Sequence, residues 1–331
     1  MSTPRLLLVS PAFHGYWRAI QGALERRGYA VTTHLYDVRT PLARARHKLT
    51  REVLPRLGAT DRGASDGDAA VAAIRMTDPH VLLVVKGDTL GEVFWDRAQQ
   101  VPRRALWLYD EIRRTRHTTA SLAAAGPIAS YSPKDVATLT AQGLPAIHVP
   151  LAFDARTQVP PRARADEVTF VGARYPNREA LLTALAAAGL PVRAYGRDWS
   201  GHPWDRLRTL RLRTPALPAG RDLNRPQAYA VFAASAASIN IHGDQDGFTM
   251  RTFEVPGVGG VHLVDRADVD SFYDPEREVA VFGDAEEAIE VARRVRRDLA
   301  WAEAIRRAGQ ARTLAEHTFD HRAAALEGLW A

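Results

Sequence analysis

Short, unbroken apolar runs recur along this chain, and a turn or a helical pattern follows each of them. The clearest are residues 5–10 (RLLLVS), 80–85 (HVLLVV) and 104–109 (RALWLY). A continuous apolar run of this length is typical of a strand that is buried on both faces of a parallel sheet. Between the first two runs, residues 16–27 place apolar side chains every three or four positions, which predicts an amphipathic helix. Strands that alternate with helices predict βαβ units and therefore an α/β fold.

The same pattern begins again after a polar segment that contains Pro160-Pro161. We therefore predict two Rossmann-like domains that face each other across a cleft, with ligands at the carboxyl ends of the strands. The predicted second-half strands are residues 168–171, 192–195, 238–242 and 260–264. The predicted parts are an N-terminal domain (1–153), a linker (154–167), a C-terminal domain (168–315) and a closing segment (316–331) that could pack back toward the first domain. Residues 40–68 are polar and basic, and they give no interpretable pattern.

The composition excludes several classes of protein. Hydrophobic residues make up 46% of the chain and charged residues 25%, as in ordinary globular proteins. No apolar run approaches the ~20 residues that span a bilayer. The apolar stretch at residues 6–9 is too short for the core of a signal peptide, so we expect a cytoplasmic protein. The absence of cysteine excludes disulfides, thiolate metal sites and cysteine nucleophiles.

The positive charge comes almost entirely from arginine. The formal net charge is +6, and lysine occurs only at Lys48, Lys86 and Lys134. Such usage is typical of a GC-rich genome, although some arginines could instead bind an anion such as a nucleotide phosphate. The densest arginine runs lack the interleaved aromatic residues that favour nucleic-acid binding, so we expect no nucleic-acid partner.

Residues 239–265 (INIHGDQDGFTMRTFEVPGVGGVHLVD) hold the side chains best suited to chemistry, and they lie between two predicted strands. A short helix predicted to begin near Thr252 would place Glu254 in its first turn. Backbone N–H groups at a helix start attract anions, so a diphosphate could bind there. Arg251 could neutralise phosphate charge, and the carboxylate of Glu254 can accept two hydrogen bonds from a ribose diol.

This segment resembles the acidic-Gly-Phe…Glu…Gly signature of group 1 glycosyltransferases with the GT-B fold of two Rossmann-like domains. Asp246 and Glu254 are the two acids, eight positions apart, and Gly259-Gly260 follows them. The CgeB-like branch is the most similar. The residues that match it are Asn240-Ile241-His242, Thr249, Arg251, Phe253-Glu254, Pro256, Val171-Gly172, Tyr195-Gly196 with Trp199, and Glu316-His317-Thr318-Phe319 with His321-Arg322. The resemblance covers residues 168–325 well and residues 1–150 more loosely, where it rests on Val85-Lys86-Gly87, Trp107 and Asp110.

The resemblance implies a transfer of sugar from a nucleoside-diphosphate donor to a small-molecule or glycan acceptor. Glu254 would bind the ribose, Asp246 would contact the donor sugar, and nearby arginines would bind the phosphates. If the reaction inverts configuration, His14 and Asp110 are the candidate bases; if it retains, as the acidic pair slightly favours, no strong base is needed. The catalytic candidates are thus His14, Asp110 and Asp246. The donor-binding candidates are Gly15, Gly172, Arg174, Arg178, His242, Gly247, Phe248, Thr249, Arg251, Thr252 and Glu254.

Other interpretations of these residues remain open. Glu254 could cap its helix, Asp246 could be a turn residue, and His242 could be structural. Asp244-Gln245-Asp246 has the Asp-x-Asp spacing of metal-dependent glycosyltransferases, but it lies deep in the second domain, and we expect neither a metal nor a cofactor. The alternative functions are a nucleotide-sugar epimerase of the same fold and a non-catalytic nucleotide-sugar-binding protein. The first turn lacks Gly-x-Gly-x-x-Gly, which argues against a dinucleotide-dependent oxidoreductase.

Overall fold

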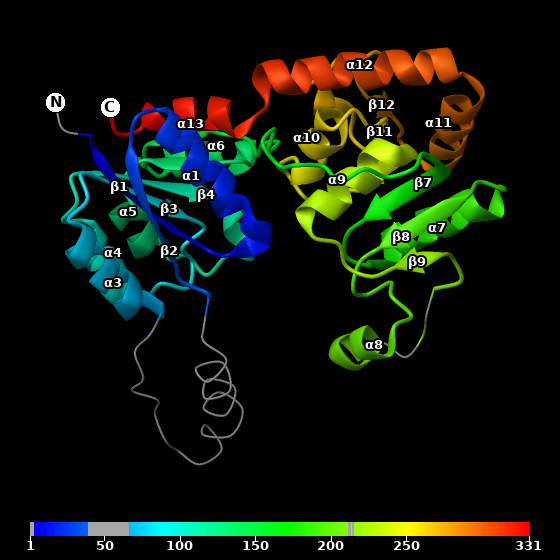
Figure 1. Ribbon diagram of the computed structural model, residues 1–331. Helices are drawn as coiled ribbons and strands as arrows, with labels where there is room; N and C mark the ends of the chain where they lie inside the picture. The colour runs from blue at the N-terminus through cyan, green and yellow to red at the C-terminus, as the bar shows by residue number, and fades with distance from the viewer. Residues whose placement is uncertain (1–2, 39–65, 211–212, 214) are drawn as a thin grey trace. The chain divides into compact units, whose positions relative to one another are not determined.

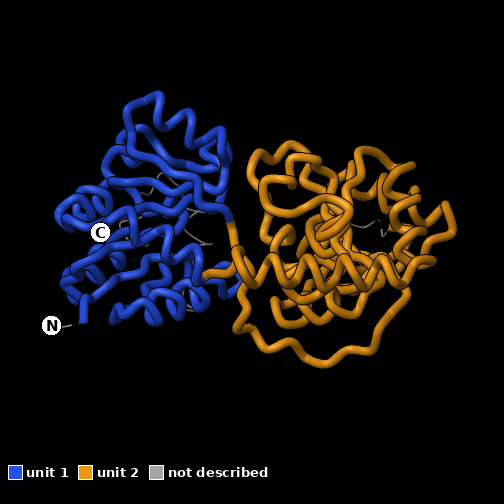
Figure 2. The backbone as a smooth tube through the Cα atoms, turned by 90° about the horizontal axis from the view of Figure 1, so that it is seen from above, with its two compact units in different colours: residues 1–150, 320–331 blue, residues 151–319 orange. Residues whose placement is uncertain are grey.

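The computed structural model describes residues 3–38, 66–210, 213 and 215–331 (Figure 1). This part of the chain forms two compact units, one of residues 1–150 and 320–331 and the other of residues 151–319 (Figure 2). Each unit contains a six-stranded sheet, and all the strand pairings described in both sheets are parallel. The structure therefore confirms the predicted α/β class with two Rossmann-like halves.

The sheet of the first unit has the strand order β2-β1-β3-β4-β5-β6. The strand order changes direction between β1 and β3, and in such sheets a ligand crevice forms at that point, beyond the carboxyl ends of the strands. Apart from Arg5, the residues of these two strands are buried, with Leu7, Leu8, Leu82 and Leu83 at 0% exposure, as the apolar runs predict. The strands are β1 Arg5–Ser10, β2 Ala30–Leu35, β3 Val81–Val85, β4 Arg103–Leu108, β5 Ile128–Ser130 and β6 Ala146–His148. The helices are η1 Phe13–Gly15, α1 Tyr16–Arg26, α3 Asp66–Thr77, α4 Glu92–Ala98, η3 Ile112–Arg114, α5 Thr119–Ala124 and α6 Pro133–Ala141.

The sheet of the second unit has the order β12-β11-β10-β7-β8-β9, and its direction changes between β7 and β10. Its core is built around the buried side chains of Val168, Leu182, Trp199 and Leu263. The strands are β7 Ala165–Val171, β8 Val192–Tyr195, β9 Ala219–Gly220, β10 Ser235–Asn240, β11 His262–Val264 and β12 Ala280–Val281. The helices are α7 Pro176–Ala187, α8 Pro203–Thr209, α9 Arg225–Ala234, α10 Met250–Gly257, η4 Ala267–Ser271, α11 Ala285–Arg297 and α12 Leu299–Glu316.

The end of the chain returns to the first unit through α13, Phe319–Glu327 (red in Figure 1). Asp320 pairs with Arg26, Glu327 pairs with Arg27, and the Trp330 indole N–H donates to the Tyr29 hydroxyl at 3.0 Å. No helix among the described residues is long and apolar enough to cross a membrane.

Two predicted helix starts are wrong, for local reasons. Helix α10 begins at Met250 rather than near Thr252, because only Thr249 keeps the extended backbone of an N-cap. The sequence also predicts Asn177 as the N-cap of α7. The helix instead begins at Pro176, a residue favoured at the first helical position, where no N–H donor is needed.

Strand β10 covers residues 235–240 rather than the predicted 238–242. The hydroxyls of Ser235 and Ser238 both hydrogen-bond the Thr169 hydroxyl of β7 at 2.9 Å. Pairing with β7 therefore extends the strand over residues 235–237, whose sequence has no strong preference for a strand. Helices α4, α5, α6, α8 and α13 were not predicted. Most of the uninterpreted segment 40–68 lies outside the described residues.

Candidate active site

Most of the predicted donor-binding residues lie at the carboxyl edge of the second unit's sheet, where β7 and β10 are neighbours. The loop after β7 contains Gly172 and leads into α7, and the loop after β10 contains His242 and leads into α10. Because all strands run the same way, both loops open on the same edge. This is the edge at which open parallel sheets bind ligands.

Gly172 lies in a tightly packed turn. Its N–H donates to the Tyr195 carbonyl at 3.0 Å, and its carbonyl accepts from the Trp199 indole N–H at 2.9 Å. A Cβ on Gly196 would come within 2.5 Å of the Gly172 carbonyl oxygen, so glycine is needed where the loops after β7 and β8 meet. The backbone of this turn is therefore fixed before any ligand arrives.

Two predicted phosphate-binding arginines, Arg174 in the loop before α7 and Arg178 in its first turn, both have protein partners. Arg174 is buried, and its guanidinium makes two hydrogen bonds to Glu179, at 2.8 and 2.6 Å. Arg178 donates to the Ile241 carbonyl, which follows β10, at 3.1 and 2.7 Å. The Glu179 carboxylate offsets the charge of Arg174, whereas Arg178 donates to a neutral backbone carbonyl. Arg178 is thus the better suited of the two to attract a phosphate.

Arg251 and Glu254 form an ion pair on α10. Glu254 lies in the second turn of the helix and is 0% exposed, so it does not cap the helix start. Its Oε2 accepts from Arg251 Nη1, while Arg251 Nε donates to the Val171 carbonyl at the end of β7, at 3.4 Å. The Arg251 side chain is 27% exposed. A ligand hydroxyl can therefore reach Glu254 only if the surrounding side chains move.

His242 belongs to a buried network that holds the start of α10. Its Nδ1 lies 2.7 Å from Asp265 Oδ1, and its Nε2 lies 3.2 Å from the Thr252 hydroxyl. Asn240 Nδ2 donates to the Thr249 hydroxyl at 3.1 Å and to the Thr252 hydroxyl at 3.3 Å. With a carboxylate at Nδ1, the neutral ring keeps its proton there and accepts at Nε2. These contacts suit His242, Thr249 and Thr252 to positioning the helix.

The loop that carries Asp246, Gly247 and Phe248 is held by Arg266, a residue that the sequence interpretation missed. Arg266 Nη1 donates to the carbonyls of Gln245 at 2.9 Å and Asp246 at 2.5 Å. The Arg266 guanidinium also lies 4.0 Å from the centre of the Phe248 ring, which is buried. Its place just beyond the carboxyl end of β11 is the signal that could have identified it. The Asp246 side chain is half-buried beside this anchor.

The predicted residues of the first unit lie at the carboxyl edge of its own sheet. His14 and Gly15 follow β1 and have left-handed backbones, with φ of 45° and 75°. Asp110 follows β4, and its carboxylate pairs with the Lys86 ammonium. Lys86 follows β3 and is also left-handed, with φ of 63°. Such conformations cost energy in residues other than glycine and tend to gather at functional sites.

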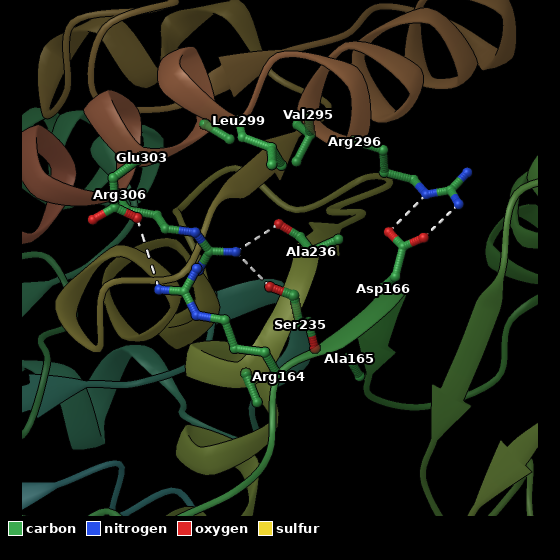
Figure 3. Close-up of a pocket in the computed structure, with 12 residues that line it drawn as sticks. Arg164, Ala165, Asp166, Ser235, Ala236, Val295, Arg296, Leu299, Glu303 and Arg306 are labelled. Atoms are coloured by element: carbon green, nitrogen blue, oxygen red, sulfur yellow. Dashed lines mark hydrogen bonds and ion pairs between the residues drawn. The ribbon is translucent and has the colours of Figure 1, made fainter.

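A cavity of the second unit, about 510 Å³, lies at the opposite edge of the sheet from the candidate donor site, beside the starts of β7 and β10 (Figure 3). Arg306 crosses it and donates to the carbonyls of Gly259 at 2.9 Å and Ala236 at 2.8 Å. Arg296 makes two hydrogen bonds to Asp166 in the same view. Both arginines already donate to backbone or carboxylate acceptors. Because the cavity lies at the opposite edge of the sheet, it is separate from the candidate donor site.

Comparison with known proteins gives a family match for part of the chain. Residues 174–328 match the model of a glycosyl transferase-like family, and these residues include α10 and its ion pair. Comparison with curated protein sequences gives no match.

Solved structures share the fold over the whole chain. Sucrose-phosphate synthase from Thermosynechococcus elongatus has a TM-score of 0.66 at 17% identity, covering 99% of this chain and 98% of its own. Anabaena HepE in complex with UDP and glucose has a TM-score of 0.67 at 11% identity, covering 98% of both chains. A protein assigned as a UDP-N-acetylglucosamine 2-epimerase from Listeria monocytogenes has a TM-score of 0.57 at 12% identity, covering 98% and 95%. The chain thus has the fold of GT-B glycosyltransferases, and residues 174–328 are glycosyltransferase-like; the CgeB-like branch stays a prediction.

Proposed function

We propose that this chain is a glycosyltransferase that transfers a sugar from a nucleoside-diphosphate donor to an acceptor hydroxyl without a metal ion. The observation that carries the proposal is the Arg251–Glu254 pair of α10, held against the end of β7 at the ligand-binding edge of the second unit. The pair also lies within the region that matches the glycosyl transferase-like model.

In this proposal the diphosphate binds between the Gly172 turn and the start of α10. Backbone N–H groups at the helix start favour the negative charge, and Arg178 and Arg251 add positive charge nearby. When Arg251 turns toward the phosphate, Glu254 becomes available to the ribose hydroxyls. The charge that develops on the leaving diphosphate is stabilised by these preorganised groups.

The donor sugar in this proposal contacts Asp246. Its loop is held by two hydrogen bonds from Arg266, which fix the backbone and leave the side chain half-buried. We favour retention of configuration, in which no strong base is required. Asp110 suits this choice, because the Lys86 ammonium already pairs with its carboxylate.

The test is acceptor-dependent release of nucleoside diphosphate from the full-length protein, supplied with UDP-, GDP-, ADP- and dTDP-sugars and a panel of acceptors, with and without EDTA. We expect release with one donor class, dependent on the acceptor and unaffected by EDTA. Conversion of the nucleotide sugar in the absence of acceptor would instead identify an epimerase, an activity also found on this fold. Tight donor binding with no turnover would identify a binding protein.

A further inference from the structure

A cavity of about 280 Å³ lies at the carboxyl edge of the first unit's sheet. Its walls come from the residues that directly follow four adjacent strands, β2, β1, β3 and β4. It therefore occupies the place where this type of sheet binds ligands. Its volume is near the lower limit of roughly 300 Å³ for small-molecule pockets, so it suits a single ring rather than an extended chain.

The turn after β3 brings two polar side chains to this cavity. Lys86 and Gly87 are both left-handed, with φ of 63° and 71°, and a Cβ on Gly87 would lie 2.7 Å from a methyl group of Val84. Two left-handed residues in succession reverse the chain, so Lys86 and Asp88 both line the same cavity. The His117 ring supports the turn, with Nε2 2.7 Å from the Lys86 carbonyl oxygen.

The charges on the cavity wall do not balance. Asp37, Asp88 and Asp110 line it together with a single cation, Lys86, whose ammonium pairs with Asp110. Asp37 accepts a hydrogen bond from the Ala12 N–H at 2.7 Å, and Asp88 accepts one from the Arg116 N–H at 3.3 Å. Across residues 3–38, 66–210, 213 and 215–331, neither Asp37 nor Asp88 forms an ion pair with a side chain. Among the described residues, two carboxylates of the cavity wall thus have no cation paired with them.

The remaining wall is aromatic. Phe13 lines the cavity and is 53% exposed, and Tyr36 and Tyr109 line it as well. Tyr36 is buried, and its hydroxyl accepts from the Gly87 N–H at 3.2 Å. Burial and the negative charges of Asp88, Asp37 and Asp110 raise the pKa of Tyr36 against the lowering effect of that hydrogen bond. Aromatic faces beside carboxylates are the lining that attracts an organic cation or an aminated ring.

A metal ion fits this cavity less well than an organic cation. Within the described part of the chain, no three Asp, Glu or His side chains are close enough together to hold one metal ion. The carboxylates instead face a space the size of a small ring.

We propose that this cavity binds the acceptor, and that the acceptor is a hydroxylated ring carrying a protonated amine that Asp37 and Asp88 recognise. That the ligand is an acceptor substrate rests on the proposed function, whereas the selectivity of the cavity for an amine rests on the residues that line it. Neutral polyols lack the positive charge that Asp37 and Asp88 would recognise, and the two carboxylates repel anionic acceptors.

The experiment uses two matched pairs of probes on the full-length protein: D-glucosamine with D-glucose, and 2-deoxystreptamine with scyllo-inositol. Binding is followed by thermal shift and by ligand-observed NMR at low and high salt. We expect the amines to bind at least about ten-fold more tightly than their neutral partners, and to lose that advantage at high salt. Asp88→Asn and Asp37→Asn keep the side-chain shape and should each reduce amine binding about ten-fold, whereas Asp96→Asn, at an exposed carboxylate on α4 away from the cavity, should not.

Equal binding of amines and neutral partners, no binding of either amine, or a preference unchanged in both Asn variants would overturn the inference. UDP, GDP, ADP and dTDP are titrated into the same samples. If a nucleotide binds but no amine preference is found, the acceptor class is wrong and the glycosyltransferase proposal stands. If the amine preference is found but no nucleotide binds, the cavity is correctly described and the proposed function fails.

Discussion

The Arg251–Glu254 pair allows a quantitative test by a double-mutant cycle of Glu254→Gln and Arg251→Met. Glu254 is 0% exposed and Arg251 is 27% exposed, so the two partners differ in their access to water. Removing one partner of a buried pair costs about 3–5 kcal/mol when the other charge stays buried. We therefore expect the two single substitutions to have unequal costs.

Glu254→Gln should lower the free energy of unfolding by about 1.5–3 kcal/mol, the value of a charge-assisted hydrogen bond, because Arg251 can turn toward solvent. Arg251→Met should cost more, about 3–5 kcal/mol, because it leaves the fully buried Glu254 carboxylate without its cation. In the double variant neither charge remains, so the pair should show a coupling energy of about 1–3 kcal/mol.

Urea unfolding followed by tryptophan fluorescence and circular dichroism measures these values at equilibrium. The same Glu254→Gln protein should bind nucleotide at least about ten-fold more weakly, because the ribose loses a charged acceptor. Additive costs with a coupling near zero would refute the buried pair. A stability loss with unchanged nucleotide affinity would refute the ribose contact and leave Glu254 a purely structural role.

Three further predictions concern single residues. Arg266→Ala should raise the KM for the donor more than it lowers kcat, because the Asp246 loop loses two hydrogen bonds from a cation. Steady-state kinetics measures the changes in KM and kcat separately, and an unchanged KM would contradict the prediction. Both ring nitrogens of His262 are buried without a hydrogen-bond partner among the described residues, and burial lowers its pKa to about 3. Below about pH 6.5 the unfolded state therefore binds a proton that the folded state does not. The free energy of unfolding should then fall by about 1.4 kcal/mol for each unit that the pH is lowered from about 6.5 to about 3. His262→Leu should flatten this slope in urea titrations, and an unchanged slope would contradict the prediction. Gly196→Ala should lower the melting temperature by an amount equivalent to about 1–3 kcal/mol and also weaken nucleotide binding, because its Cβ would force the Gly172 carbonyl aside; calorimetry showing a wild-type melting temperature would contradict the predicted clash.

Strands could be predicted from the sequence wherever burial on both faces requires an unbroken run of apolar residues. The runs at 5–10 and 80–85 became β1 and β3 because every side chain along them except the first of each run meets the core. Residues 235–237 (SAA) carry no such signal, and pairing with β7 decides their conformation. The start of α10 was missed because an extended backbone at Thr249 is visible only in the structure.

The sequence suggests which residues form the candidate site, and that choice stays a prediction; the partners of those residues could not be predicted. The family resemblance suggests Arg174 as a phosphate ligand, and only the fold shows that Glu179 already pairs with it. The sequence likewise suggests Asp110 as a base, and only the fold brings Lys86 onto it from a neighbouring strand. Arg266 was missed because its role comes from contacts with a loop about twenty residues earlier, which no local pattern encodes.

We propose that the second unit binds a nucleoside diphosphate without a metal ion, and a thermal-shift titration with UDP, GDP, ADP and dTDP, with and without EDTA, tests this binding. Binding to the folded state alone stabilises it by about 2.7 kcal/mol at one hundred times the dissociation constant, which a melting curve resolves. We predict that one nucleotide raises the melting temperature of the wild type equally with and without EDTA, and raises that of Glu254→Gln much less. Stabilisation that EDTA abolishes would contradict the metal-free site, and no stabilisation by any of the four nucleotides or their sugars would contradict the donor site itself.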